Sequence, residues 1–244
     1  MTLPVFLSDA VTGAVAGTSL VLDGDEGRHA ATVKRIRVGE QLVLTDGAGT
    51  SATCTVTGAA KSSLELTVGS SSFADRATPT ITVVQALPKG DRGELAVEVL
   101  TEIDVDRIVP WAASRSVAVW KGERAVKGRA KWEATAREAT KQARRSWLPE
   151  IAPLASTEDV VSLIAEADVA VVLHEDADQP LAEVAFDGAS SIVVVVGPEG
   201  GISDEELLAF AGARAVRLGT SVLRTSTAGV AAVAAILSRT RRWA

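Results

Sequence analysis

A short apolar run that leads into a glycine-rich loop constrains the fold of this chain more than any other feature. Ile192–Val196 run directly into Gly197-Pro198-Glu199-Gly200-Gly201, and two further loops follow at Leu218-Gly219 and Val222–Ala228. Strands that end in glycine-rich loops are typical of α/β domains, which build small-molecule pockets at the carboxyl ends of their strands. The sequence therefore predicts an α/β fold with a ligand site at these loops.

Apolar strands and helical segments alternate from residue 80 onward, which indicates a mainly parallel sheet. We expect strands at 80–87, 107–111, 168–174, 191–197 and 214–218, and helices at 91–103, 123–146, 203–212 and 226–240. Ser203 and Glu206 have the spacing of a capping box, so a helix should begin just after Gly201 and direct its N-terminal amides toward the glycine loop.

The N-terminal part has a different pattern. Short β-rich runs at 19–22, 41–44, 53–56 and 64–68 alternate with turn signals, which favours a small β-barrel. The polar stretch that follows closes with Pro79 and suits a linker. We therefore predict three parts: a barrel over 1–72, a linker over 73–79 and an α/β domain over 80–244.

Composition excludes several classes of protein. Cys54 is the one cysteine, and the two histidines, His29 and His174, are far apart, so no metal is expected. The apolar runs are far shorter than the roughly 18 residues of a membrane span, and the first residues do not resemble a signal peptide. We expect a cytoplasmic protein.

Positive charge gathers in one segment of a chain whose net charge is −6. Residues 115–150 hold ten cations and four acids. On a helix, Trp132, Ala136, Ala139 and Ala143 form an apolar stripe, and the cations outside it are Arg137, Lys141, Arg144 and Arg145. The outward face is therefore predicted to be cationic, either as a solvated surface or as a contact for a polyanion.

The loops favour a ligand without phosphates. Neither common phosphate-binding glycine motif is present, and Glu199 would repel a pyrophosphate. Backbone N–H and C=O groups can read an adenine edge, and glycines can admit a ribose. S-adenosylmethionine is such a ligand.

These blocks closely resemble the C-terminal signature of the ribosomal small-subunit methyltransferase E family, within the SPOUT superfamily of trefoil-knotted methyltransferases. The resemblance continues upstream through Gln85-Ala86-Leu87-Pro88-Lys89, through Glu138–Arg145 with Leu148-Pro149-Glu150-Ile151, and through His29-x-x-x-Val33-x-Arg35 of a PUA-like barrel. It spans nearly the whole chain. Departures from the family pattern are Ile103-Asp104 after the first helix, Lys141 in place of an acid, and Ser226, which we expect to cap the final helix.

The resemblance implies a PUA-like β-barrel followed by a SPOUT trefoil-knot domain. It implies methyl transfer from S-adenosylmethionine to N3 of a uridine in 16S rRNA of the small ribosomal subunit, carried out by a homodimer. The implied cofactor residues are Leu173, Gly197, Glu199, Gly200, Gly201, Leu218, Gly219, Leu223, Arg224 and Thr225. The implied RNA-binding residues are Arg28, His29, Lys34, Arg35, Lys89, Arg92, Arg137, Lys141, Arg144 and Arg145.

The chemistry gives Arg224 a candidate catalytic role. Methylation of uracil N3 requires loss of the imide proton or stabilisation of negative charge on O2 or O4, which a permanent cation can supply. A structural role for Arg224 is equally compatible with the sequence, and no general base is assigned. Two other functions stay open: another SPOUT RNA methyltransferase with a different target atom, and a non-catalytic RNA-binding factor in ribosome assembly.

Overall fold

The computed structural model describes residues 2–243, which form two compact units. The first unit contains the chain up to Arg76 together with Thr140–Leu148, and the second contains Ala77–Ala139 and Pro149 onward. The sequence analysis assigned Thr140–Leu148 to the second domain, whereas the structure places this segment in the first unit.

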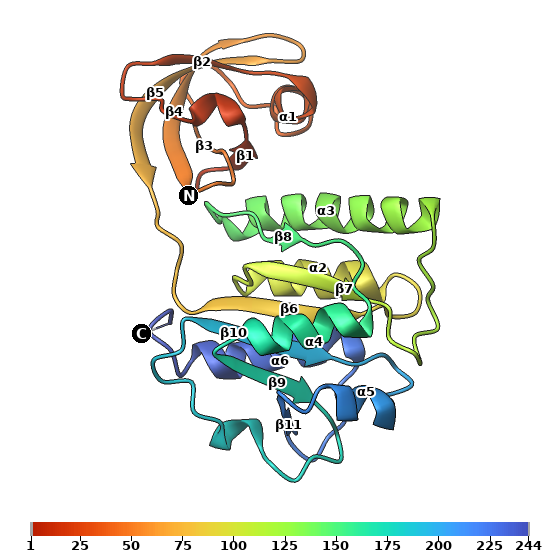
Figure 1. Cartoon of the computed structure of the whole chain (residues 1–244). Coiled ribbons are helices and arrows are strands. Elements are labelled where there is room, and N and C mark those ends of the chain that lie inside the picture. Colours follow the sequence, from red (N-terminus) through yellow and green to blue (C-terminus); the bar gives the residue numbers. More distant parts are fainter. Residues whose placement is uncertain (1, 244) are drawn as a thin grey trace. The chain divides into compact units, whose positions relative to one another are not determined.

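The first unit is a curled five-stranded sheet (Figure 1). Its strands, in the spatial order β1-β3-β4-β5-β2, are β1 (Val5–Leu7), β3 (Gln41–Thr45), β4 (Thr50–Ala59), β5 (Leu64–Phe73) and β2 (Ser19–Leu22). The first pair is parallel and the others are antiparallel. Alternate residues of these strands, such as Leu42, Leu44, Cys54 and Leu66, point into one apolar core. A short helix α1 (Gly24–Arg28) and the helical turn His29–Val33 follow β2.

The second unit is built on a six-stranded sheet in which every pairing is parallel, as the alternating pattern predicted. Its order is β11 (Arg214–Val216), β9 (Val169–Leu173), β10 (Ser191–Val196), β6 (Thr80–Ala86), β7 (Arg107–Trp111) and β8 (Glu150–Ile151). The central strand β10 is buried on both faces, which explains its continuous apolar run.

Helices cover both faces of this sheet (Figure 1). Val194 and Val196 share one core with α2 (Arg92–Glu102), α3 (Glu123–Ala143) and α6 (Thr225–Leu237). Val193 and Val195 face a second core with α4 (Thr157–Glu166) and the end of α5 (Asp204–Ala209). No helix in the part of the chain that the structure describes combines the length and apolar character of a membrane span.

The prediction that α3 reaches residue 146 is wrong. The helix ends at Ala143 because Arg144 adopts a left-handed backbone with φ 57°, and the Arg145 N–H donates to the Thr140 carbonyl at 3.0 Å. This six-to-one hydrogen bond is that of a Schellman motif, which terminates a helix. The helix α4 and the two-residue strand β8 were not predicted.

The outward cationic face is also smaller than predicted. Lys141 Nζ contacts Glu26 Oε1 at 2.8 Å, and the Lys141 side chain is only 8% exposed. Arg145 is buried as well, whereas Arg137 and Arg144 are exposed. The helical stripe misplaced Lys141 and Arg145 because the segment Thr140–Leu148 belongs to the first unit, which covers them.

Asp168 joins the beginnings of β9 and β10 and should make stability depend on pH. Ser190 N and Ser191 N donate to Asp168 Oδ2 at 2.8 and 3.0 Å, and these hydrogen bonds hold the pKa of the carboxyl below its ordinary value. A depressed native pKa adds stability above the unfolded pKa of about 3.9, and this stability is lost as the pH falls through the native value. We expect the free energy of unfolding, measured with denaturant from pH 5 to pH 2, to fall less steeply for Asp168→Asn than for wild type. The same slope in both would contradict this assignment, and Asp187→Asn controls for the change in charge.

Candidate cofactor site

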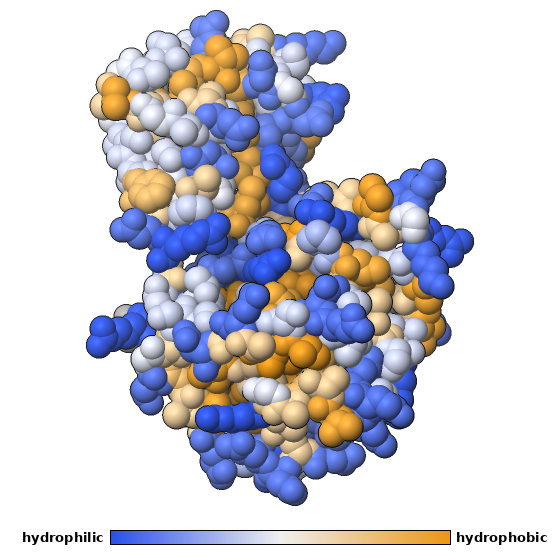
Figure 2. All heavy atoms as spheres, viewed as in Figure 1, coloured by the Kyte–Doolittle hydropathy of each residue, from blue (hydrophilic) through white to orange (hydrophobic). Residues whose placement is uncertain are grey.

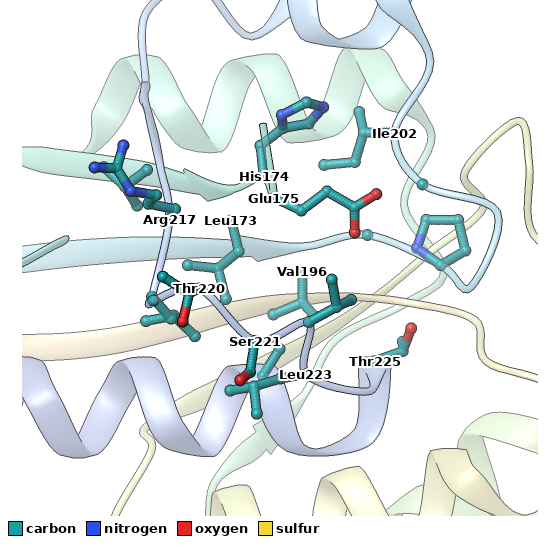
Figure 3. A pocket seen from close by; sticks show the side chains of 18 residues that line it. Leu173, His174, Glu175, Val196, Ile202, Arg217, Thr220, Ser221, Leu223 and Thr225 are labelled. Carbon is teal, nitrogen blue, oxygen red and sulfur yellow. The ribbon is translucent and has the colours of Figure 1, made fainter. Parts of the chain in front are cut away.

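A pocket opens at the carboxyl ends of β9, β10 and β11, beside the first turn of α6 (Figure 3). Its lining consists of Leu173–Glu175, Val196–Pro198, Gly201, Ile202, Val216–Leu223, Thr225 and Ala228. The three loops that the sequence analysis singled out therefore meet at one place. The strand ends of a parallel sheet are the usual position for such a site.

The glycines of the first loop are required by close contacts. A Cβ atom at Gly197 would lie 2.7 Å from Ile202 Cγ1, and one at Gly200 would lie 3.1 Å from the carbonyl oxygen of Arg115. Gly201 has φ 75° and donates its N–H to the Pro198 carbonyl at 3.0 Å. A larger residue would clash at Gly197, crowd Arg115 at Gly200 and strain the backbone at Gly201, so the loop turns tightly beneath the pocket.

Helix α5 anchors this loop as the capping box predicted. The Glu206 N–H donates to Ser203 Oγ, while the Ser203 N–H donates to Glu206 Oε2 at 3.0 Å. Glu206 Oε1 also accepts the Ser114 N–H at 2.7 Å. The nearly buried Glu206 thus ties the glycine loop to the loop that follows β7.

Seven of the ten predicted cofactor residues line the pocket: Leu173, Gly197, Gly201, Leu218, Gly219, Leu223 and Thr225. The lining does not include Glu199, Gly200 or Arg224. Glu199 Oε1 accepts the Lys89 N–H at 3.2 Å. Exposed Arg224 is the N-cap residue of α6, and its carbonyl accepts the N–H groups of Thr227 and Ala228.

The pocket also contains polar residues that the sequence analysis did not assign to it. His174 and Glu175 follow β9, and Figure 3 shows both side chains among those that line the pocket. Arg217 braces the 174–180 loop, because its Nη1 donates to the carbonyls of Ala177, at 2.7 Å, and Asp178. The sequence signal for these three residues was their position at or next to the end of a predicted strand. That signal is weak, because loop conformation decides which side chains face the pocket.

Ser226 does not cap the final helix, contrary to the prediction. Arg224 occupies the N-cap position without a side-chain capping bond, and Ser226 is buried within the first turn. Ser226 Oγ lies 3.5 Å from Arg92 Nη1, at the start of α2. The hydroxyl therefore faces a neighbouring helix rather than the amides of its own.

The predicted RNA-binding cations belong to both units. In the first unit, Lys34, Arg35 and Arg144 are exposed, Arg28 pairs with Asp25 at 2.5 Å, and His29 lies edge-on to Phe6. In the second unit, Lys89 and Arg137 are exposed and Arg92 is half-buried. Figure 2 shows that hydrophilic residues cover much of the face in view.

Gly219 offers a direct test of the pocket. A Cβ atom there would meet nothing within 4 Å, and the backbone lies outside the left-handed region. Because Gly219 lines the pocket, we expect the side chain of Gly219→Val to take up space at the pocket and to leave the fold intact. We expect affinity for S-adenosylmethionine, measured by calorimetry, to fall about tenfold to a hundredfold. The affinity of Gly219→Ala should fall less, and both variants should have the melting temperature of wild type. Wild-type affinity in Gly219→Val would place the cofactor elsewhere.

Comparison with protein families and solved structures agrees with this arrangement. Residues 76–237 match an RNA methyltransferase domain, and residues 22–69 match an RNA methyltransferase PUA domain. The fold class predicted from the sequence is confirmed: a PUA-like sheet precedes a SPOUT-type domain with a parallel sheet.

Individual relatives extend the match over nearly the whole chain. Ribosomal RNA small subunit methyltransferase E of Mycobacterium bovis is 48% identical over 95% of this chain and 89% of its own length. The Bacillus subtilis protein of the same name is 28% identical, with 90% of each chain covered. The Neisseria gonorrhoeae enzyme of that name, solved bound to S-adenosyl methionine, has a TM-score of 0.87 and 27% identity and covers 97% of this chain and 98% of its own. This chain belongs to the ribosomal RNA small subunit methyltransferase E family.

Proposed function

We propose that this protein transfers the methyl group of S-adenosylmethionine to N3 of a uridine in 16S rRNA. The observation that carries the proposal is the glycine-loop pocket in a chain that is 48% identical to the Mycobacterium bovis enzyme. The lining suits the cofactor, because the Gly219 position leaves open space and the 216–223 backbone offers hydrogen-bonding groups for an adenine edge. When bound, S-adenosylmethionine supplies an electrophilic methyl group.

The residues around the pocket would have different roles toward the cofactor and the uracil. Leu173, Leu218 and Leu223 provide apolar walls. The carboxylate of Glu175 can accept hydrogen bonds from ribose hydroxyls or balance the positive charge of the cofactor. Arg224, just outside the pocket, is the candidate stabiliser of negative charge on uracil O2 or O4.

The partners complete the proposal. Exposed cations of both units, including Lys34, Lys89, Arg137 and Arg144, would hold rRNA phosphates. We also infer a homodimer, as the family resemblance implies. A monomer in sedimentation at micromolar concentration would contradict that inference. Since small subunits are the substrate, we place the reaction in the cytoplasm.

Incubation with labelled S-adenosylmethionine and small subunits that lack the modification tests the function. We expect methyl on N3 of a single 16S uridine, mapped by mass spectrometry. A different methylated atom would favour another SPOUT activity. Failure of the purified protein to bind the cofactor would favour a non-catalytic assembly factor.

A further inference from the structure

We propose that Phe73, Arg76 and Trp147 form a stacking platform that binds an unpaired base of the RNA substrate. All three residues belong to the first unit. The Arg76 guanidinium carbon lies 4.1 Å from the centroid of the Trp147 ring, and Phe73 meets that ring edge-on, with centroids 6.1 Å apart at 78°. The inference rests on the RNA methyltransferase function proposed above and names one place where the RNA is held.

Hydrogen bonds fix the platform in position. The Trp147 indole N–H donates to the Ala74 carbonyl at 2.8 Å, and the Gly49 N–H donates to the Ser146 carbonyl at 2.9 Å. A Cβ atom at Gly49 would lie 2.7 Å from Trp147 Cζ2 and 2.8 Å from Phe73 Cε2, so both rings pack against the same backbone atom. Preorganised rings lose little conformational entropy when a ligand stacks on them.

The platform is open to solvent. Phe73 is 63% exposed, although it is a large apolar residue at the end of a strand. Arg76 is exposed as well, and Trp147 is half-buried. A guanidinium that covers an aromatic ring on one side can receive a nucleobase on the other.

The chemistry of the platform favours single-stranded RNA. Exposed aromatic rings beside cations are how proteins hold unpaired nucleotides, because each base offers a flat face and each linkage a negative charge. Arg76 and exposed Arg144, three residues before Trp147, supply the cations. A duplex hides the faces of its bases, so it should gain from the charges but not from the rings.

Fluorescence anisotropy with a single-stranded oligouridine and with an RNA duplex tests the platform. In the full-length protein, Phe73→Ala should bind the single strand about tenfold more weakly and the duplex nearly as well as wild type. Because no charge is lost, the dependence of affinity on salt should keep its slope. Phe73→Tyr retains an aromatic ring and should bind like wild type. Arg76→Lys retains the charge but lacks the planar guanidinium, so it should weaken single-strand binding. Val38→Ala, another exposed apolar position in the first unit, is the control.

The inference would be overturned by wild-type affinity in Phe73→Ala, by an equal loss in Val38→Ala, or by equal losses for single strand and duplex. Unchanged RNA binding with reduced methylation of intact subunits would also overturn it, and would point to a contact with a ribosomal protein. Wild-type protein that binds oligouridine through the platform but methylates no subunit RNA would contradict the proposed function alone. Melting temperatures of the variants separate lost binding from lost folding.

Discussion

Arg224→Ala should lower the rate constant of methyl transfer about a hundredfold to a thousandfold and leave the affinity for S-adenosylmethionine nearly unchanged. The Arg224 side chain is exposed at the first turn of α6 and is absent from the described pocket lining, whereas its neighbours Leu223 and Thr225 line the pocket. A cation at this border can stabilise the charge that develops on the uracil oxygens as N3 loses its proton. Single-turnover kinetics on small subunits measure the rate, and calorimetry measures cofactor binding.

Two variants separate this role from a structural one. Arg224→Lys keeps the charge and should retain part of the rate, whereas Arg214→Ala removes an exposed arginine of β11 and should have little effect. A lower melting temperature of Arg224→Ala with an unchanged rate would assign Arg224 to the start of α6. Weaker cofactor binding with an unchanged rate constant would make it a cofactor ligand.

Arg242→Ala should lower the free energy of unfolding by about 3–5 kcal/mol, because it leaves the Asp106 carboxylate, whose side chain is only 10% exposed, without its charged partner. The Arg242 side chain is 3% exposed and contacts Asp104 Oδ2 at 2.5 Å and Asp106 Oδ2 at 2.6 Å. Its Nη1 also donates to the Pro79 carbonyl at 2.8 Å. Burial acts to lower the pKa of Arg242, but the two carboxylates outweigh it and leave the pKa raised.

Denaturant unfolding measures this loss, and Arg241→Ala, at an exposed neighbour, is the matched control. Asp106 also accepts the Ile81 N–H at 2.7 Å, so the network connects the end of the chain to the first strand of the sheet. A loss below about 1 kcal/mol, the range of exposed ion pairs, would show that the network is open to water.

The same network accounts for a departure from the family pattern. Asp104 follows Ile103, the C-cap of α2, with φ 73°, a left-handed conformation that ordinarily favours glycine. An aspartate in this conformation is strained, but its carboxylate forms an ion pair with Arg242. The sequence identified Asp104 as a departure from the family pattern, but only the structure shows that it pairs with Arg242, 138 residues away.

What the sequence predicted well was encoded locally. Ile192–Val196 formed the buried central strand, and Ser203 with Glu206 started α5 as expected. Helix α4 was missed although Ser156 and Asp159 form a capping box at its start, a signal that the sequence contained. A helical pattern does not show which residues are covered by distant parts of the chain. Lys141 lies on the polar side of the apolar stripe, yet it is buried and pairs with Glu26. Glu175 and Arg217 joined the pocket through loop conformations that neighbouring residues do not determine.

The return of Thr140–Leu148 to the first unit affects how the chain can be made. These residues are synthesised only after β6 and β7 of the second unit, yet the Leu148 N–H donates to the Gly47 carbonyl and the Gly49 N–H to the Ser146 carbonyl. A nascent chain that ends before residue 140 therefore lacks part of its own N-terminal fold. The first unit can therefore be completed only after part of the second unit has been synthesised. For the same reason, a fragment that ends at Arg76 would lack the segment that contacts Gly47 and Gly49.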